Sequence, residues 1–206
     1  MRERPKDLRV VKTIDAIRSA FRRMVIEKGF AAITVKELCE RARINKKTFY
    51  RYYPAIEYLL AEVQAQYSKP YVERIEGLSF PRDTEAITRA FLEFSVAQDE
   101  FYEAITVAGP HDAIREQMVT EVEQAGGLSG SAVPDGWDEG EWGLYLAHVT
   151  SAPLRIYQAW IEGGKAVAPQ RMVETGVALV VRGARALEGG VHRNTHITPG
   201  SGLCAG

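Results

Sequence analysis

The sequence has no long hydrophobic run and very little cysteine. Its longest apolar stretches, such as residues 177–181, fall far short of the roughly 20 residues that a helix needs to cross a bilayer. The basic N-terminus is not followed by an apolar segment, which argues against a secretory signal peptide. Cys39 and Cys204 form no CxxC pair and no disulfide framework. We therefore expect a protein of the reducing cytoplasm.

Residue patterns typical of catalysis are also missing. The sequence contains no Gly-rich phosphate loop, no nucleophile–base arrangement and no cluster of metal ligands. His192 and His196 have no acidic or cysteine neighbour, so we interpret them as solvated rather than metal-bound. We therefore expect no enzymatic activity, no catalytic residue, no metal and no cofactor.

Charge is distributed unevenly along the 206 residues, although the net charge is only −1. Residues 1–53 carry 15 Lys or Arg and 6 Asp or Glu, a net of +9, whereas the remaining residues carry 11 and 21, a net of −10. A basic segment on an acidic body predicts a polyanionic partner for that segment alone. An anionic membrane is the less favoured partner, because the basic segment lacks the wide apolar side of an interfacial helix.

Apolar residues recur at three- and four-residue spacing through most of the chain. No segment alternates as a strand would, so we expect an all-α fold. The first helix is expected over residues 9–28, with Gly29 as a left-handed cap. A later helix opens with Pro54 in its first turn, and Pro70 is expected to kink or break it near residues 68–69.

The second part of the chain predicts a larger helical module. Asp83 is expected as an N-cap, Pro153 is expected to bend a long helix over residues 141–162, and Pro169 is expected to open the last helix. The tail from residue 188 onward is expected to be disordered. The remaining features are apolar stripes at 87–94, 101–105 and 114–122 and a glycine-rich loop at 126–140.

Residues 33–60 predict two short helices joined by a tight turn. The first is expected to open with a capping box in which Thr34 is followed by Glu three residues later. Asn45 is expected to cap the second helix, and Phe49 and Tyr53, four residues apart, are expected to face the core. The exposed face of that helix then carries Lys, Arg, Thr and Tyr but no Glu, a composition that suits contact with phosphates and base edges.

These features resemble the TetR family of bacterial transcription regulators. The resemblance covers roughly residues 10–60 and rests on the Gly29-Phe30 step, the Thr-capped helix, the tight turn and the run Thr48-Phe49-Tyr50. It implies a three-helix DNA-binding head with a helix-turn-helix and a larger helical domain for ligand binding and dimerisation. We accordingly expect domains at 1–53 and 54–187, followed by the tail at 188–206.

The resemblance also implies which residues contact DNA, and two positions depart from the family pattern. Arg43 stands where the turn usually has Gly, and Ile56 stands where the family often has a phosphate-binding Lys. Phosphate contact is implied for Thr34, Thr48, Tyr50 and Tyr52, and base or phosphate contact for Lys36, Asn45, Lys46, Lys47 and Arg51. Among these, Asn45, Lys46 and Lys47 are expected to read the base sequence.

The function expected from this resemblance is a homodimeric repressor that a small molecule releases from a palindromic DNA operator. Dimerisation is expected through the last two long helices, where Gly176 and Gly183 on one helix and Ser151 and Ala152 on the other allow close approach; packing within one chain is the alternative use of these residues. Pro70 is a candidate hinge, with a fixed kink as the alternative. The candidate ligand-binding residues, each of which is also a candidate core residue, are Phe94, Phe101, Tyr102, Trp142, Tyr145, His148 and Tyr157.

A second hypothesis retains the DNA-binding head but has no ligand. The helical body would then dock another protein, and the whole would act as a DNA-binding adaptor. An enclosed cavity in the body favours the ligand, whereas a solid body with an exposed apolar patch favours the protein partner.

Overall fold

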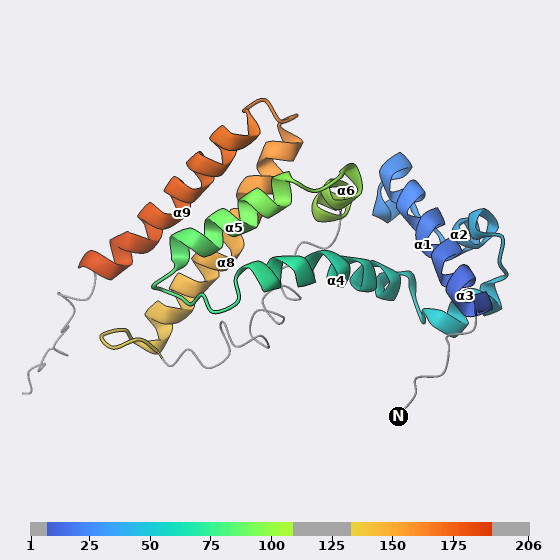
Figure 1. Cartoon of the computed structure of the whole chain (residues 1–206), viewed down its shortest axis with the longest axis horizontal. Coiled ribbons are helices and arrows are strands. Elements are labelled where there is room, and N and C mark those ends of the chain that lie inside the picture. The colour runs from blue at the N-terminus through green and yellow to red at the C-terminus, as the bar shows by residue number, and fades with distance from the viewer. Residues whose placement is uncertain (1–7, 109–132, 191–206) are drawn as a thin grey trace, which may run out of the picture.

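The computed structural model describes residues 8–108 and 133–190, and every regular element in these two ranges is a helix. The expected all-α fold is thus confirmed. The molecule is elongated, with one group of helices at each end (Figure 1). The helix α4, Ile56–Arg74, runs between the two groups.

The smaller group, which we call the head, contains α1 (Leu8–Lys28), the short 3-10 helix η1 (Phe30–Ala32), α2 (Val35–Ala42) and α3 (Lys46–Tyr52). The apolar stripe of α1 packs into a small core, in which its residues Ile17, Phe21 and Met24 are fully buried. Leu38 of α2 and Phe49 of α3 complete that core. The first half of α4 also belongs to it, because its residues at 59, 60 and 63 are buried in the same cluster.

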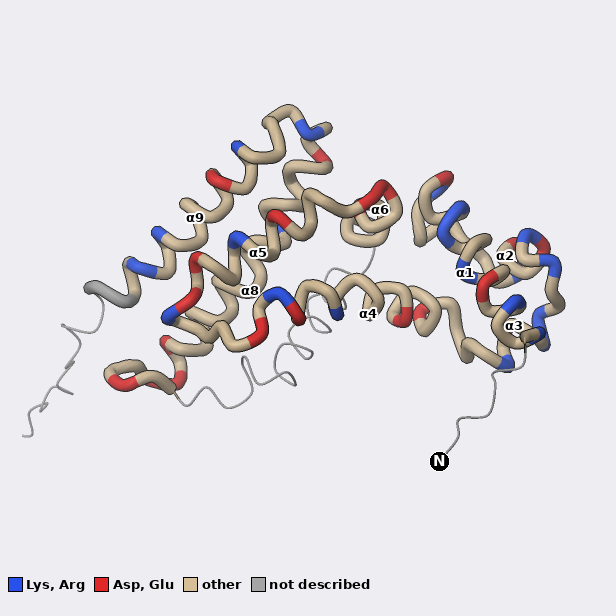
Figure 2. The backbone as a smooth tube through the Cα atoms, viewed as in Figure 1, with Lys and Arg blue, Asp and Glu red and all other residues tan. Residues whose placement is uncertain are grey.

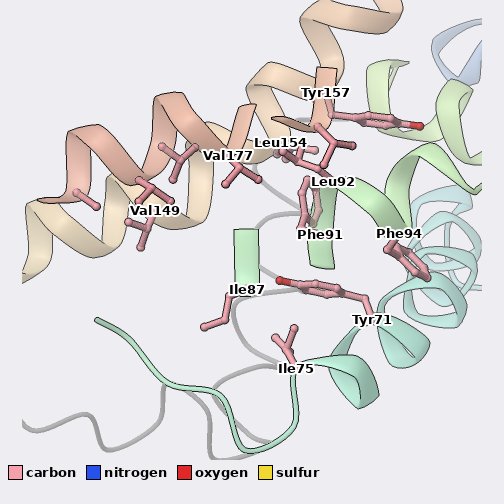
Figure 3. Close-up of a cluster of buried hydrophobic side chains, with 14 of the residues drawn as sticks. Tyr71, Ile75, Ile87, Phe91, Leu92, Phe94, Val149, Leu154, Tyr157 and Val177 are labelled. Atoms are coloured by element: carbon pink, nitrogen blue, oxygen red, sulfur yellow. The ribbon is translucent and has the colours of Figure 1, made fainter. Parts of the chain in front are cut away.

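The larger group, which we call the body, contains α5 (Thr84–Val96), α6 (Glu100–Ala108), α8 (Glu139–Glu162) and α9 (Pro169–Gly190). The helices α5, α8 and α9 pack against one another, and their apolar residues meet those of the second half of α4, including Tyr71 and Ile75 (Figure 3). The helix predicted near 114–122 and most of the glycine-rich loop lie outside the described residues, as does the tail beyond 190. The tail was expected to begin at 188, but α9 continues to Gly190.

Neither internal proline ends its helix. α4 continues past Pro70 to Arg74, and α8 continues past Pro153 to Glu162. Of the kink or break expected near 68–69, the break therefore does not occur, while the kink stays a prediction. A proline inside a helix costs about 3 kcal/mol, but burial of neighbouring residues, Tyr71 in α4 and Leu154 in α8, holds the helix in place.

Three expected helix ends also differ in detail. Pro54 precedes α4 instead of opening it, since Ala55 is the N-cap. Gly29 has the expected positive φ of 76° but a ψ of 157°, which is an extended conformation outside the left-handed helical region. Asp83 stands at the N-cap of α5 without capping it, because its Oδ2 accepts hydrogen bonds from the backbone N–H of Ser79 and from Arg82.

Candidate DNA-binding surface

The first helix of the helix-turn-helix begins at a side-chain cap. The Oγ1 atom of Thr34 accepts a hydrogen bond from the backbone N–H of Glu37 at 3.3 Å, as expected. The reciprocal half of the capping box is absent, because the Glu37 carboxylate pairs with Lys28 and Arg41. The cap therefore fixes the start of α2, and the ion pairs join α2 to the end of α1.

The turn between α2 and α3 closes around Arg43 in a left-handed conformation, with φ 56° and ψ 43°. The backbone N–H of Ile44 donates to the carbonyl of Cys39 at 3.0 Å, which is the bond of a Schellman motif. A non-glycine residue in this region is strained. Arg43 thus adopts the left-handed turn conformation that the family usually achieves with glycine.

The second helix, α3, is capped and anchored by its own residues. Asn45 Oδ1 accepts from the backbone N–H of Thr48 at 2.7 Å and from its hydroxyl at 2.9 Å. Phe49 is fully buried and Tyr53 is 4% exposed, so both face the core as predicted. These contacts hold α3 as a rigid platform whose outer side chains are free to contact a partner.

The nine predicted DNA-contacting residues all lie on α2, α3 or their N-caps. Tyr50 is 51% exposed, and only Thr48 and Tyr52 are half-buried among the nine. Figure 2 shows Lys and Arg gathered around α2 and α3 at the outer end of the molecule. The exposed members are Thr34, Lys36, Asn45, Lys46, Lys47, Tyr50 and Arg51.

Several cations of the head form ion pairs within the chain. Lys28 and Arg41 pair with acidic residues of α1 and α2, and Arg18 and Arg22 of α1 pair with Glu62 and Asp99. In contrast, Lys36, Arg43, Lys46, Lys47 and Arg51 form no ion pair with any residue that the structure describes. Cations without an internal partner are available to neutralise phosphates, which supplies the salt-dependent part of DNA affinity.

A polar contact that the sequence did not indicate supports α3 from behind. The Tyr53 hydroxyl donates to Glu62 Oε1 at 2.9 Å, and Arg18 of α1 contacts the same carboxylate at 2.8 Å. Burial raises the pKa of Tyr53 to about 12, with Glu62 acting in the same direction and Arg18 opposing it. Glu62 thereby joins α1, α4 and the end of α3. Its role follows from contacts across 44 residues, which no local pattern reveals.

Residues 17–63 match the sequence model of the bacterial regulatory proteins of the tetR family. This matched segment contains the DNA-binding helices typical of that family. The matched segment starts in α1 and ends at Val63, the last α4 residue that is buried in the head core. The chain is accordingly a DNA-binding transcriptional regulator. No protein with a curated description matches it.

Solved structures show the same fold over most of the chain. NalD of Pseudomonas aeruginosa, described as the secondary repressor of the MexAB-OprM multidrug efflux pump, is 18% identical with a TM-score of 0.57, covering 85% of this chain and 96% of its own. The fatty acid degradation regulator FadR of Bacillus halodurans is 14% identical with a TM-score of 0.54, covering 86% and 97%. A TetR-like regulator of Rhodococcus sp. RHA1 is 17% identical with a TM-score of 0.51, covering 89% and 99%. At these identities the likeness concerns the fold.

The candidate ligand-binding residues of this chain lie in separate places. Phe101 packs into the head core and lines an open hollow of about 540 Å³ between α1, α4 and α6. His148 lies between α8 and α9, where its Nε2 is 3.1 Å from the carbonyl oxygen of Val180. The other five residues are buried in two aromatic groups. One group contains Phe94, Tyr102 and Tyr157. In the other group, Trp142 stacks on Tyr145.

The small residues of α9 pack inside the chain. A Cβ atom at Gly176 would lie 2.7 Å from Leu92, and one at Gly183 would lie 2.8 Å from His148. Both glycines therefore allow close approach between helices of one protomer, which was the alternative to their use at a dimer interface. No helix among the described residues is long and apolar enough to cross a membrane.

Proposed function

We propose that this chain is a homodimeric repressor that binds a palindromic operator in the cytoplasm and leaves it when a small molecule binds the body. The observation that carries the DNA part is the exposed face of α2 and α3, where five cations form no ion pair with a described residue and lie beside the hydroxyls of Thr34 and Tyr50. Two heads related by two-fold symmetry would enter successive major grooves, about one helical turn apart or slightly more.

The DNA-binding proposal is tested on an operator selected from random duplexes. Lys47→Ala is expected to weaken binding about tenfold or more, and to reduce the slope of affinity against salt by about one ion, because one phosphate or base contact is lost. Tyr50→Ala is expected to weaken binding with little change in salt slope, since its hydroxyl is uncharged. Fluorescence anisotropy over a salt series measures both quantities.

A matched control is Lys69→Ala, which removes an exposed cation from the body half of α4. That variant is expected to bind as the unaltered protein does. If Lys47→Ala and Tyr50→Ala both keep the original affinity and salt slope, α3 does not contact DNA as proposed.

The dimer proposal is supported by exposed apolar residues on the last two long helices. Leu144 of α8 is 71% exposed and Leu179 of α9 is 60% exposed. Leu144 lies one turn from His148, which contacts Val180, the residue after Leu179. A second copy that packs on α8 and α9 would cover both exposed leucines.

The small-molecule part of the proposal is supported by NalD and FadR only through a shared fold. An effector releases the operator only if it binds more tightly to the conformation whose heads no longer fit the DNA. Screening small molecules for those that weaken operator binding tests this part. A protein partner that binds Leu144 and Leu179 instead would support the adaptor hypothesis, in which no effector exists.

A further inference from the structure

The helix α6 belongs to both hydrophobic cores. Its residues Phe101 and Ile105 are 2% and 1% exposed in the head cluster, where Phe101 meets Phe21 of α1 edge to face at 6.2 Å. Its residue Tyr102 is buried in the body cluster, against Tyr157 of α8. In Figure 1, α6 lies between α1 and α5. A displacement of α6 within the body therefore also displaces part of the head core.

A polar triad fixes the first turn of α6 to the head. Asp99 caps this helix, since its Oδ1 accepts the backbone N–H of Tyr102 at 3.0 Å. The Arg22 guanidinium of α1 donates to Asp99 Oδ2 and, at 3.2 Å, to the Tyr67 hydroxyl of α4. The Tyr67 hydroxyl in turn donates to Asp99 Oδ1 at 3.3 Å. Three helices thus meet through Arg22, Asp99 and Tyr67.

The ring of Tyr67 joins the two cores at the same point. It packs against both clusters and lies 6.4 Å from the ring of Phe101 and 5.1 Å from that of Tyr102, measured between centroids. The Arg22 guanidinium lies over the Phe101 ring at 4.8 Å. Polar and apolar contacts therefore coincide at the start of α6.

We propose that Arg22, Asp99 and Tyr67 form a latch through which the body sets the position of α1, and with it that of the DNA-reading helices. This inference rests on the proposed ligand-responsive repression. The side chains of Arg22 and Asp99 are 45% and 49% exposed, so the ion pair adds little adhesion of its own. Its directional bonds instead fix the register of α6 on α1, while Phe101 supplies the apolar contact.

The latch gives the body a direct contact with α1 through Arg22 and Asp99, and Tyr67 of α4 supports that contact. Opening Arg22–Asp99 frees α1 to shift against α6 without any bend in α4. An effector that favours a displaced α6 would then change the head separation by differential affinity for the two positions. Reciprocally, operator DNA that fixes the separation of the heads would favour the undisplaced position of α6.

The chain offers a matched pair of variants on α6 and its cap. Asp99→Asn keeps an amide oxygen that caps α6 but loses the ion pair with Arg22 of the head. Glu103→Gln loses the ion pair with Lys165, which lies in the body, at 2.5 Å. Both change one carboxylate to an amide, but only the first touches the head.

Hydrogen exchange of the full chain, read by mass spectrometry, tests the latch without DNA. Asp99→Asn is expected to speed amide exchange in α1 about fivefold or more, a change that corresponds to a typical coupling between sites, while Glu103→Gln leaves α1 unchanged. Tyr67→Phe, which keeps the ring and loses the hydroxyl, is expected to change exchange in the same direction by less. Equal α1 exchange in Asp99→Asn and Glu103→Gln overturns the latch.

Adding the selected operator tests the coupling itself. In the unaltered protein and in Glu103→Gln, operator is expected to slow exchange in α6 as well as in α1–α3. In Asp99→Asn, operator is expected to slow amide exchange in α1–α3 but not in α6. If operator also slows exchange in α6 of that variant, the latch does not couple the head to the body. An operator that binds none of the proteins overturns the proposed function, while the comparison without DNA still decides the latch.

Discussion

Arg43 occupies a backbone conformation that an L-residue adopts only under strain, and its charge lies in the turn that joins the two DNA-reading helices. The two properties are separable. A glycine would relieve the strain of about 1–2 kcal/mol but would lose about 0.5–1 kcal/mol more backbone entropy on folding. Substitution by glycine or by alanine would remove the positive charge of Arg43.

We expect Arg43→Gly to raise the free energy of unfolding by about 0.5–1 kcal/mol. Arg43→Ala, which keeps the strain and removes the charge, is expected to leave stability nearly unchanged. Urea denaturation measures both variants. If operator affinity falls equally in both, the guanidinium contacts DNA. A fall in stability of Arg43→Gly would contradict the strain at this position.

Tyr53 predicts an alkaline limit to the stability of the head. Its folded-state pKa, about 12, is above the value near 10 of an unfolded chain, because burial and the Glu62 carboxylate disfavour the phenolate. The stabilising contribution is therefore complete below about pH 10 and is lost as pH rises toward about 12. Tyr53→Phe is expected to reduce this loss without removing it, because burial also raises the pKa of Tyr102 to about 12. Denaturation of both proteins across that range measures the difference. A profile that Tyr53→Phe leaves unaltered contradicts the assignment.

At single positions, short-range patterns predicted the structure well. Thr34, Asn45 and Phe49 act as their spacing indicated, because a cap or a helix face depends on residues within four positions. Glu37 and Asp83 differed from expectation, because nearby basic side chains and a turn N–H compete for their carboxylates.

Among the helices, α6 shows how an element of one module stabilises another. Phe101 lies in the sequence of the regulatory body, but its ring completes the core of the head. Phe101→Ala is expected to destabilise the head by about 3–5 kcal/mol, because a buried aromatic ring is replaced by a cavity.

The matched control is Phe94→Ala, which removes an equally buried ring, 4% exposed, from the body core. That variant is expected to destabilise the body first. The rates of amide hydrogen exchange in α1 of the head and α9 of the body distinguish destabilisation of the head by Phe101→Ala from destabilisation of the body by Phe94→Ala. Faster exchange in α9 than in α1 for Phe101→Ala would mean that α6 belongs to the body alone.

The sequence predicted where most helices lie but not which cores they join. Helical periodicity marks an apolar face in α6 without stating its neighbour, and Phe101 and Tyr102 were therefore expected together in a ligand site. Of the two outcomes expected at Pro70, a kink or a break, the break does not occur. Pro70 and Pro153 are local disturbances, and the burial that outweighs them comes from distant residues.

For the whole molecule, the separation of a basic head from an acidic body follows directly from the sequence, and Figure 2 shows the head cations around α2 and α3. The proposed two-fold assembly depends on surfaces that sequence patterns identify poorly. Gly176 and Gly183 indicated an interface but pack within the chain, whereas Leu144 and Leu179 are exposed.

We expect light scattering at micromolar concentration to give twice the mass of one chain. Leu144→Asp combined with Leu179→Asp is expected to halve that mass, because a charge would be buried at each leucine. Val167→Asp is the control, since Val167 is 44% exposed in the turn between α8 and α9. A monomeric mass for the unaltered protein contradicts the dimer and favours another protein as the partner of these leucines.

The aromatic group of the body, in which Trp142 stacks on Tyr145 and Trp137 meets both, has an optical consequence. All three tryptophans of the chain, at 137, 142 and 160, follow α6 in sequence, and the head contains none. Intrinsic tryptophan emission is therefore blind to the head itself. Any change in that emission when operator is added would come from the body in response to an event at the head, and would record coupling between the two without a label.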